Sequence, residues 1–251
     1  MYTIYILVAV LIIIAGYLWY RRVPHTKYVV SLTTIPSRLS KLQPVLDSYL
    51  SQSIKPEKII LNIPREYMRF PGKQIQVPDY GPHVLINRTP EDYGPATKLL
   101  GTLGLKLDPD TIIIVSDDDN VKKPYWARDL IRSIRANPGA ASTVSTPWSK
   151  RPGGAPGKFI FGGGGFGFYR KLIDSNVLMN FFTKAKSKCM FVDDDMFTYF
   201  FDSQNIEIVG VDYGPGNKPY VAESNEFGDK LRSGGPGKRE TLQKQCKAHI
   251  N

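Results

Sequence analysis

The chain has 251 residues and contains 33 Lys and Arg against 23 Asp and Glu, which gives a formal net charge of +10. A chain of this length predicts one compact domain. The two cysteines, Cys189 and Cys246, exclude a disulfide framework and a four-cysteine zinc site, and three histidines leave little material for a histidine-based metal centre. We therefore expect oxygen ligands for any metal.

The first residues form a separate segment. Tyr2 to Tyr20 carries no charge, is about long enough to cross a bilayer as a helix, and has aromatic residues near both ends. A cleaved signal peptide is the alternative, but it would need a basic start and a small-residue cleavage site, which this segment lacks. We expect residues 1–22 to be the transmembrane anchor of a single-pass membrane protein.

Basic residues follow this anchor directly. Arg21, Arg22 and Lys27 lie after it, and no basic residue precedes it. The positive-inside rule then places residues 21 onward in the cytosol. The scarcity of cysteine agrees with a reducing compartment, which neither forms nor needs disulfides.

Strands and helices alternate in the chain that follows. Apolar spacing and the positions of Pro and Gly predict strands over residues 27–32, 58–63, 84–86 and 111–116, and helices over 37–52, 96–105 and 125–136. The second half is less regular, since 145–167 is rich in Pro and Gly. It predicts helices from Arg170 onward and over 193–201, and a last strand over 206–211. This alternation predicts an α/β layered domain.

Three consecutive aspartates follow a continuous apolar run. Thr111 to Ser116 is typical of a strand buried on both faces of a parallel sheet, and it leads into Asp117, Asp118 and Asp119. Crowded carboxylates repel one another unless a cation lies among them, and Mg²⁺ or Mn²⁺ prefers carboxylate and phosphate oxygens. In an extended chain Asp117 and Asp119 point to the same side and can share one metal ion. A solvated loop is the alternative, but the buried strand favours a site at the carboxyl edge of the sheet.

A second triplet, Asp193 to Asp195, opens a predicted helix. Acidic residues are favourable in the first turn of any helix, and this is the purely structural explanation. The functional explanation is a general base, because a carboxylate crowded by others and partly removed from water accepts a proton more readily. Together the two triplets would supply a metal site and a base, which is the minimum needed to displace a metal-bound diphosphate.

Two further motifs could contact a ligand. The segment Asp92 to Lys98 is a turn that opens a helix, which suits a phosphate, although an ordinary capped helix with an exposed lysine explains it equally well. The glycine run from Gly162, with Gly167, matches the dinucleotide-binding pattern, but it lies far from the first strand and would leave both triplets unexplained. We interpret the run as backbone that approaches a ligand closely, with a flexible surface loop as the alternative.

Taken in chain order, these motifs resemble those of a known enzyme family. They comprise Ser31 to Arg38, Asp92 to Lys98, Ile114 to Asp119, Gly163 to Arg170 and Val192 to Asp195. The ordered set is similar to that of nucleotide-sugar glycosyltransferases of the GT-A fold, close to family 2, including those of large algal viruses. The resemblance covers residues 29–211. It implies a GT-A (Rossmann-like) α/β domain over residues 23–227, with a mixed, mainly parallel sheet flanked by helices, preceded by one transmembrane helix.

The resemblance also implies roles for individual residues. The nucleoside and the donor diphosphate would contact Thr33, Thr34, Arg38 and Lys98, and the ribose and sugar would contact Asp117 and Asp118. Mn²⁺ or Mg²⁺ would bind Asp119 together with Asp117. In the family the base lies in an acidic pair that opens a helix, often Glu-Asp, whereas here the pair lies within a triplet. We choose Asp194 as the catalytic base, Asp195 as the next candidate and Asp193 as a hydrogen-bonding neighbour.

The acceptor side is expected near the glycine run and the Pro-rich segment before it. Gly164 and Gly165 would border the acceptor there. Trp148 could stack on an acceptor sugar, although an aromatic residue in a loop more often serves packing.

The expected reaction is a single displacement that inverts the anomeric centre. A hydroxyl of a glycan or glycoconjugate acceptor, deprotonated by Asp194, attacks the anomeric carbon of a nucleoside-diphosphate sugar, with a UDP-sugar favoured as donor. A two-metal phosphodiesterase or nucleic-acid enzyme is the alternative from another class. The chain, however, lacks the basic and aromatic pattern of single-strand binding and the usual His or Glu partners of such metal sites. A non-catalytic sugar-binding relative is a third hypothesis.

Residues 228–251 form a basic C-terminal tail, with six Lys and Arg against two acidic residues. A solvated tail is the default interpretation, and closure over the donor diphosphate or contact with anionic lipid beside the anchor are the alternatives. The net charge thus suits a phosphorylated donor and an anionic membrane face, and we expect no nucleic-acid partner.

Overall fold

The computed structural model describes residues 26–73, 75–145, 159–189, 191–214 and 217–222, together with Tyr5 and Cys246. The predicted anchor, apart from Tyr5, lies outside the described residues, as do Trp148 and most of the basic tail. Across the described ranges, no helix combines the length and the apolar character needed to cross a bilayer.

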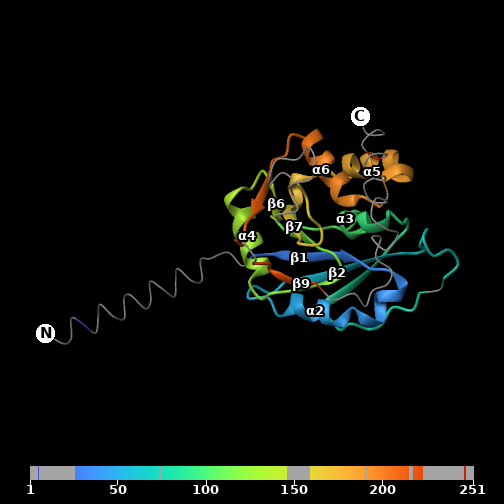
Figure 1. Ribbon diagram of the computed structural model, residues 1–251, viewed down its shortest axis with the longest axis horizontal. Coiled ribbons are helices and arrows are strands. Elements are labelled where there is room, and N and C mark those ends of the chain that lie inside the picture. Colours follow the sequence, from blue (N-terminus) through green and yellow to red (C-terminus); the bar gives the residue numbers. More distant parts are fainter. Residues whose placement is uncertain are drawn as a thin grey trace.

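A seven-stranded mixed sheet forms the centre of the domain (Figure 1). Its strands, in spatial order, are β3 (Val84–Thr89), β2 (Lys58–Pro64), β1 (Tyr28–Thr33), β4 (Ile112–Val115), β7 (Phe166–Tyr169), β6 (Ala141–Val144) and β8 (Ile208–Val211). Strand β7 runs antiparallel to both of its neighbours, and every other pairing in this sheet is parallel. The fold is therefore mixed α/β and Rossmann-like with a mostly parallel sheet, which is consistent with the predicted GT-A class.

Helices cover both faces of this sheet. Figure 1 shows α3 (Thr97–Leu103), α5 (Ser175–Cys189) and α6 (Asp193–Ser203) on one side and α2 (Gln43–Leu50) on the other. Helix α4 (Trp126–Ala136) packs in the same hydrophobic cluster as α2. Side chains alternate along β4, so that Ile113 contributes to the cluster under α3, α5 and α6 and Ile114 to the one under α2 and α4. The prediction of a strand buried on both faces is confirmed.

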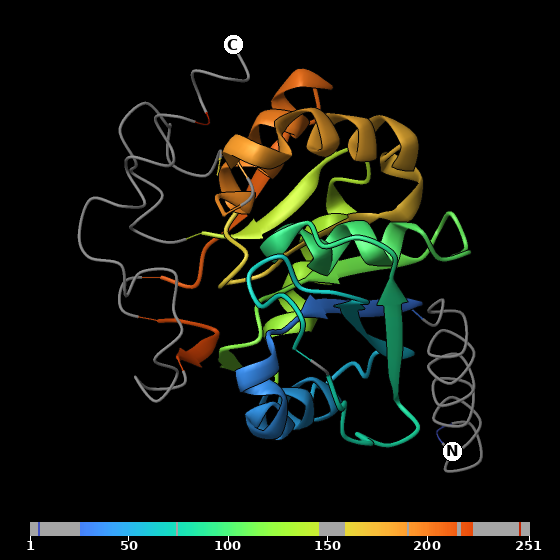
Figure 2. The same ribbon diagram turned by 90° about the vertical axis from the view of Figure 1, so that its right-hand side faces the viewer.

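A second, two-stranded sheet lies beside the first aspartate triplet. Its strands β5 (Asn120–Lys122) and β9 (Tyr220–Ala222) are antiparallel, with Val121 opposite Val221. In Figure 2 the red strand β9 lies at the edge of the domain. This pairing brings a segment from near the C-terminus back to the chain directly after Asp119.

Some predicted elements differ in detail. The helix expected over 37–52 is divided into a 3-10 helix, η1 (Pro36–Lys41), and α2, because Pro44 occupies the first turn of α2 and has no N–H to continue an earlier helix. Short 3-10 helices also precede α3, as η2 (Gly94–Ala96), and α5, as η4 (Arg170–Leu172). Strands β6 and β7 were not expected, and β7 carries Gly167, which a strand pattern disfavours.

The two cysteines form a disulfide that the sequence analysis did not anticipate. Cys189, at the end of α5, is bonded to Cys246 with a Cα–Cα distance of 4.8 Å. Cys246 is fully buried, and its Sγ lies 3.5 Å from Sδ of Met196 in α6. Disulfides persist mainly in oxidising compartments, and the cytosolic placement of the domain stays a prediction.

Candidate active site

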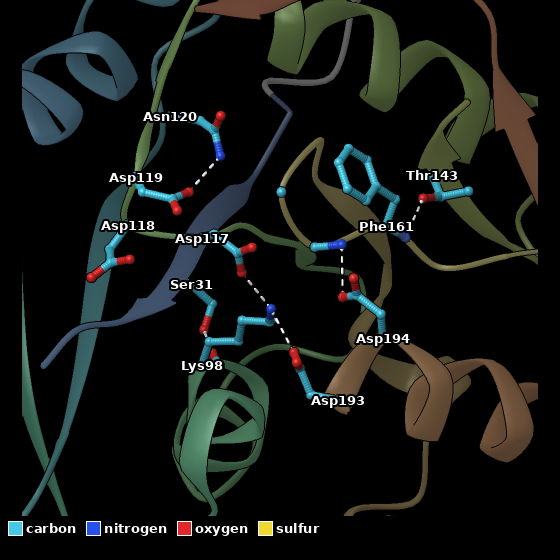
Figure 3. A network of polar contacts seen from close by, with 12 residues as sticks. Ser31, Lys98, Asp117, Asp118, Asp119, Asn120, Thr143, Phe161, Asp193 and Asp194 are labelled. Atoms are coloured by element: carbon cyan, nitrogen blue, oxygen red, sulfur yellow. Dashed lines mark hydrogen bonds and ion pairs between the residues drawn. The ribbon is translucent and has the colours of Figure 1, made fainter. Parts of the chain in front are cut away.

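Lys98 joins the two aspartate triplets (Figure 3). Its Nζ lies 2.5 Å from Oδ1 of Asp117, directly after β4, and 2.6 Å from Oδ2 of Asp193, in the first turn of α6. The side chain of Lys98 is only 2% exposed, so this ammonium is removed from water. The triplets, far apart in the sequence, therefore face each other across one buried cation.

The electrostatics of Lys98 favour its charged form. Burial acts to lower the pKa of this ammonium, but the surrounding carboxylates of Asp117, Asp193 and Asp194 outweigh burial and raise the pKa well above its usual value. Among the described residues, no group donates a hydrogen bond to Oδ2 of Asp193, and its contact with Lys98 Nζ is an ion pair. Lys98 is thus not the exposed lysine of an ordinary capped helix, which was the alternative interpretation.

A buried polar network holds α3, and with it Lys98, against the sheet. Ser31 of β1 donates a hydrogen bond to the carbonyl of Lys98, and Asn62 of β2 donates to the same carbonyl at 3.1 Å. Asn62 also donates to Oγ1 of Thr102 at 2.9 Å, and Asn87 of β3 donates to Oδ1 of Asn62 at 2.8 Å. Sequence reasoning missed this network, although Ser31 and Asn62 are polar residues within apolar strands, which is a usable signal because buried polar groups need partners.

The middle aspartate of the first triplet faces away from Lys98. Oδ1 of Asp118 accepts a hydrogen bond from Arg38 at 2.5 Å, and Oδ2 accepts one from Thr34 at 2.6 Å. Burial raises the pKa of Asp118, against the lowering effects of Arg38 and Thr34. The hydroxyl of Tyr67 donates to the carbonyl of Thr34 at 2.7 Å and fixes this loop. Three predicted donor-site residues therefore form one cluster.

Asp117 and Asp119 lie on the other side of the strand end. In Figure 3 both carboxylates point away from Asp118, as the alternation of an extended chain predicts. Asp119 Oδ1 accepts a hydrogen bond from Asn120 at 2.7 Å. Within the described part of the chain, no group of three or more His, Cys, Asp and Glu side chains could hold a metal ion. Mg²⁺ is often bound by one or two carboxylates together with substrate phosphates, and this pair fits that arrangement.

The glycine run closes the site between the triplets. The N–H of Gly162 donates to Oδ1 of Asp194 at 2.9 Å, and the carbonyl of Gly162 accepts from the N–H of Asp117 at 3.2 Å. A Cβ at position 162 would lie 2.4 Å from Nζ of Lys98 and 2.8 Å from Oδ1 of Asp194. A larger residue at this position would have to displace the ends of these side chains, and the expectation that the glycine run approaches a ligand stays a prediction.

The other described residues that were predicted for the site lie at the end of β1, in the first turn of α6 and in the glycine run. Thr33 donates from Oγ1 to the carbonyl of Asn62 at 2.7 Å, at the end of β1. Asp195 is buried in the first turn of α6 with the other two aspartates. Gly164 and Gly165 are buried, and Gly165 has a φ of +102°. Trp148 lies outside the described residues.

Comparisons with known proteins show the fold. No protein-family profile matches the chain, and no curated protein sequence matches it. Glucosyl-3-phosphoglycerate synthase from Mycobacterium tuberculosis, in complex with Mg²⁺ and UDP, is 15% identical over 92% of this chain and 83% of that chain, with a TM-score of 0.53. Its complex with Mn²⁺, UDP-glucose and phosphoglyceric acid is 13% identical over 88% and 80%, with a TM-score of 0.51.

A mannosyltransferase from Pyrobaculum calidifontis, in complex with GDP-Man and Mn²⁺, is less similar, at 12% identity over 82% of this chain and 58% of that chain and a TM-score of 0.47. At these identities the likeness is one of fold, and the fold is shared with enzymes that use nucleotide sugars. The finer assignment to family 2, and the likeness to viral enzymes, stay predictions from the motifs.

Proposed function

We propose that this protein is a metal-dependent glycosyltransferase that moves a sugar from a nucleoside-diphosphate sugar to a hydroxyl of a glycan or glycoconjugate, with inversion at the anomeric carbon. The observation that carries the proposal is the convergence of Asp117 and Asp193 on the buried ammonium of Lys98. A site for displacing a diphosphate needs carboxylates for a cation, a positive side chain for the leaving group and a base, and these groups meet here.

The donor side is built on the ends of β1 and β4. Thr33, Thr34, Arg38 and Asp118 are proposed to hold the nucleoside, and the buried cluster of Arg38, Thr34 and Asp118 supports this because it is fixed before any ligand binds. Lys98 is proposed to place positive charge beside the departing diphosphate. A uridine nucleotide is the favoured donor nucleotide.

Asp119 and Asp117 are proposed to hold Mn²⁺ or Mg²⁺. Carboxylates outnumber lysines around the end of β4. Two lysines, Lys98 and Lys122, lie among four carboxylates, which are Asp117, Asp119, Asp193 and Asp194. Such an excess of negative charge favours binding of a divalent cation. A bound ion would neutralise charge on the leaving diphosphate.

Asp194 is proposed as the base. Asp193 is held in the ion pair with Lys98, whereas Asp194 is oriented by the N–H of Gly162 and by its position in the first turn of α6. Removing the proton from the acceptor hydroxyl as it attacks makes that oxygen a better nucleophile. Asp195 is the next candidate.

Incubation of the protein with Mn²⁺ and a panel of nucleotide sugars tests the proposal. We expect slow hydrolysis of one donor without acceptor, and transfer when glycan acceptors are added. Asp119→Asn should abolish metal-dependent donor binding, whereas Asp194→Asn should keep donor binding and lose transfer. Asp202→Asn, an exposed aspartate on the same helix, is the matched control. Inert donors together with cleavage of a nucleic acid would overturn the assignment.

We also propose that residues 1–22 anchor the protein in a membrane. The support is the uncharged, aromatic-flanked sequence of that segment. Alkaline carbonate should leave the full chain in the membrane pellet, and Ile12→Lys with Ile13→Lys should release it. Release of the unchanged chain by carbonate would show a peripheral attachment instead.

A further inference from the structure

Lys122 is a buried lysine that the proposed reaction does not use. It lies on β5, is 4% exposed and donates a hydrogen bond to the carbonyl of Gly163 at 2.8 Å. The rings of Trp126 and Tyr220 lie 5.3 Å and 5.0 Å from its Nζ, which places the charge between two aromatic faces. A lysine is expensive to bury, so a specific role is expected of it.

A second side chain holds the next carbonyl of the same loop. The indole Nε1 of Trp126 donates to the carbonyl of Gly164 at 2.7 Å. The glycine run has no side chains of its own to pack, and glycine has more conformational freedom than any other residue. Two successive carbonyls are therefore held by donors from β5 and α4.

The same loop reaches the proposed base. Gly162, directly before the two anchored residues, donates its N–H to Oδ1 of Asp194. Its carbonyl accepts from the N–H of Asp117, which fixes the loop at its other end. Two hydrogen bonds, joined by the peptide bond between Gly162 and Gly163, therefore connect Lys122 to Asp194.

We propose that Lys122 is a positioning residue, which with Trp126 holds the glycine loop so that the Gly162 N–H orients the carboxylate of Asp194. This inference rests on the proposed function for the role of Asp194 as base. Strand β9 becomes part of the site through it, because Tyr220 covers the Lys122 amino group that anchors the loop. Lys122 acts through the loop and is not itself a catalytic residue.

A measurement that does not need activity tests the positioning. In protein labelled with ¹⁵N-glycine, the Gly162 amide proton should respond to its hydrogen bond with the Asp194 carboxylate by a downfield shift, and Asp194→Ala should abolish this response and so assign it. Lys122→Met should also lose the response, while Lys122→Arg should restore at least part of it. Lys123→Met removes a neighbouring, partly exposed charge and should behave as wild type.

The kinetic test separates positioning from binding. Lys122→Met should lower kcat by about 100-fold, as displacement of a catalytic group by about 1 Å does, while the Kd for the nucleoside diphosphate stays within about twofold. Trp126→Phe loses only the donor to Gly164, and it should likewise lower kcat and weaken the Gly162 amide response. This variant provides the test if Lys122→Met does not fold.

The outcomes distinguish this inference from the proposed function. An unchanged Gly162 response in Lys122→Met and Trp126→Phe would overturn the positioning role, and so would an equal loss in Lys123→Met. A wild-type protein inert towards every donor would overturn the proposed reaction, yet the amide response would still decide whether Lys122 orients Asp194.

Discussion

Lys98 and Asp193 form a buried ion pair, with 2.6 Å between Nζ and Oδ2, that joins α3 to the first turn of α6. The same ammonium binds Asp117 at the end of β4. One cation therefore links three elements, and its removal would leave a buried carboxylate, Asp193, and a partly buried one, Asp117, without their counterion.

Lys98→Met should lower the free energy of unfolding by about 3–5 kcal/mol at neutral pH, because it leaves the buried Asp193 and the partly buried Asp117 without their cation. The pKa of Lys98 is raised above its usual value, so wild-type Lys98 is charged at this pH. Urea unfolding at neutral pH measures the loss.

Lys106→Met is the matched control, because Lys106 follows α3 and is exposed. It should change the free energy of unfolding by less than about 0.5 kcal/mol. A Lys98→Met loss no larger than that of Lys106→Met would contradict the electrostatic explanation.

Lys122 should make the stability of the protein rise with pH above neutrality. The pKa of Lys122 is lowered from 10.5 to about 7, mainly by burial, against the raising effects of Asp117 and Asp119 and with a smaller lowering effect of Lys98. Between these values the unfolded chain holds a proton that the folded protein has released, so stability rises with pH. The slope from this one group approaches about 1.4 kcal/mol per pH unit.

Comparing wild type with Lys122→Met isolates that slope, because all other titrations are common to both proteins. Between pH 7 and pH 10, the free energy of unfolding of the wild type should rise relative to that of Lys122→Met. Relative to Lys123→Met it should show no such rise. A constant difference across this range would mean that Lys122 keeps an ordinary pKa in the folded protein.

The strand ends of the site could be predicted from the sequence, and the contacts between them could not. The apolar run before Asp117 locates the triplet at a sheet edge because that pattern depends only on local spacing. The ion pair of Lys98 with Asp193 has no local signal, since it depends on how α3 and α6 pack over the sheet. The motif order suggested that these residues share a site, but not which atoms meet.

Two further features lay beyond sequence reasoning for physical reasons. Lys122 precedes Lys123 in a short polar stretch, and nothing in that pattern shows that one of the two ammonium groups is buried between aromatic rings. Strand β7 was missed because Gly167 disfavours a strand, although a Cβ there would lie 2.8 Å from the carbonyl of Ile113 in the neighbouring strand. In that position the close approach of two backbones overrides intrinsic propensity.

Gly162→Ala should disrupt the site with little change elsewhere. The added Cβ would lie 2.4 Å from Lys98 Nζ and 3.1 Å from Asp117 Oδ1, so these side chains would have to move apart. We expect a loss of transfer of at least about 100-fold. Gly139→Ala is the control, because no atom lies within 4 Å of its added Cβ. Equal activity of the two variants would show that the ammonium and carboxylates tolerate the displacement.

The disulfide between Cys189 and Cys246 allows a test of the cytosolic placement expected from Arg21 and Arg22, because a reducing compartment does not keep such bonds. Alkylation of the protein in cells should leave both cysteines unlabelled until a reductant is added, and peptide mapping should find them linked. Cys246→Ser should lower the free energy of unfolding by about 4 kcal/mol, as expected for a bond that closes a loop with a sequence separation of 57 residues. The same variant measured in reductant should match the reduced wild type. Full labelling without reductant would show that the two cysteines are free in cells and that the domain lies in a reducing compartment. That result would agree with the orientation expected from the basic residues after the anchor.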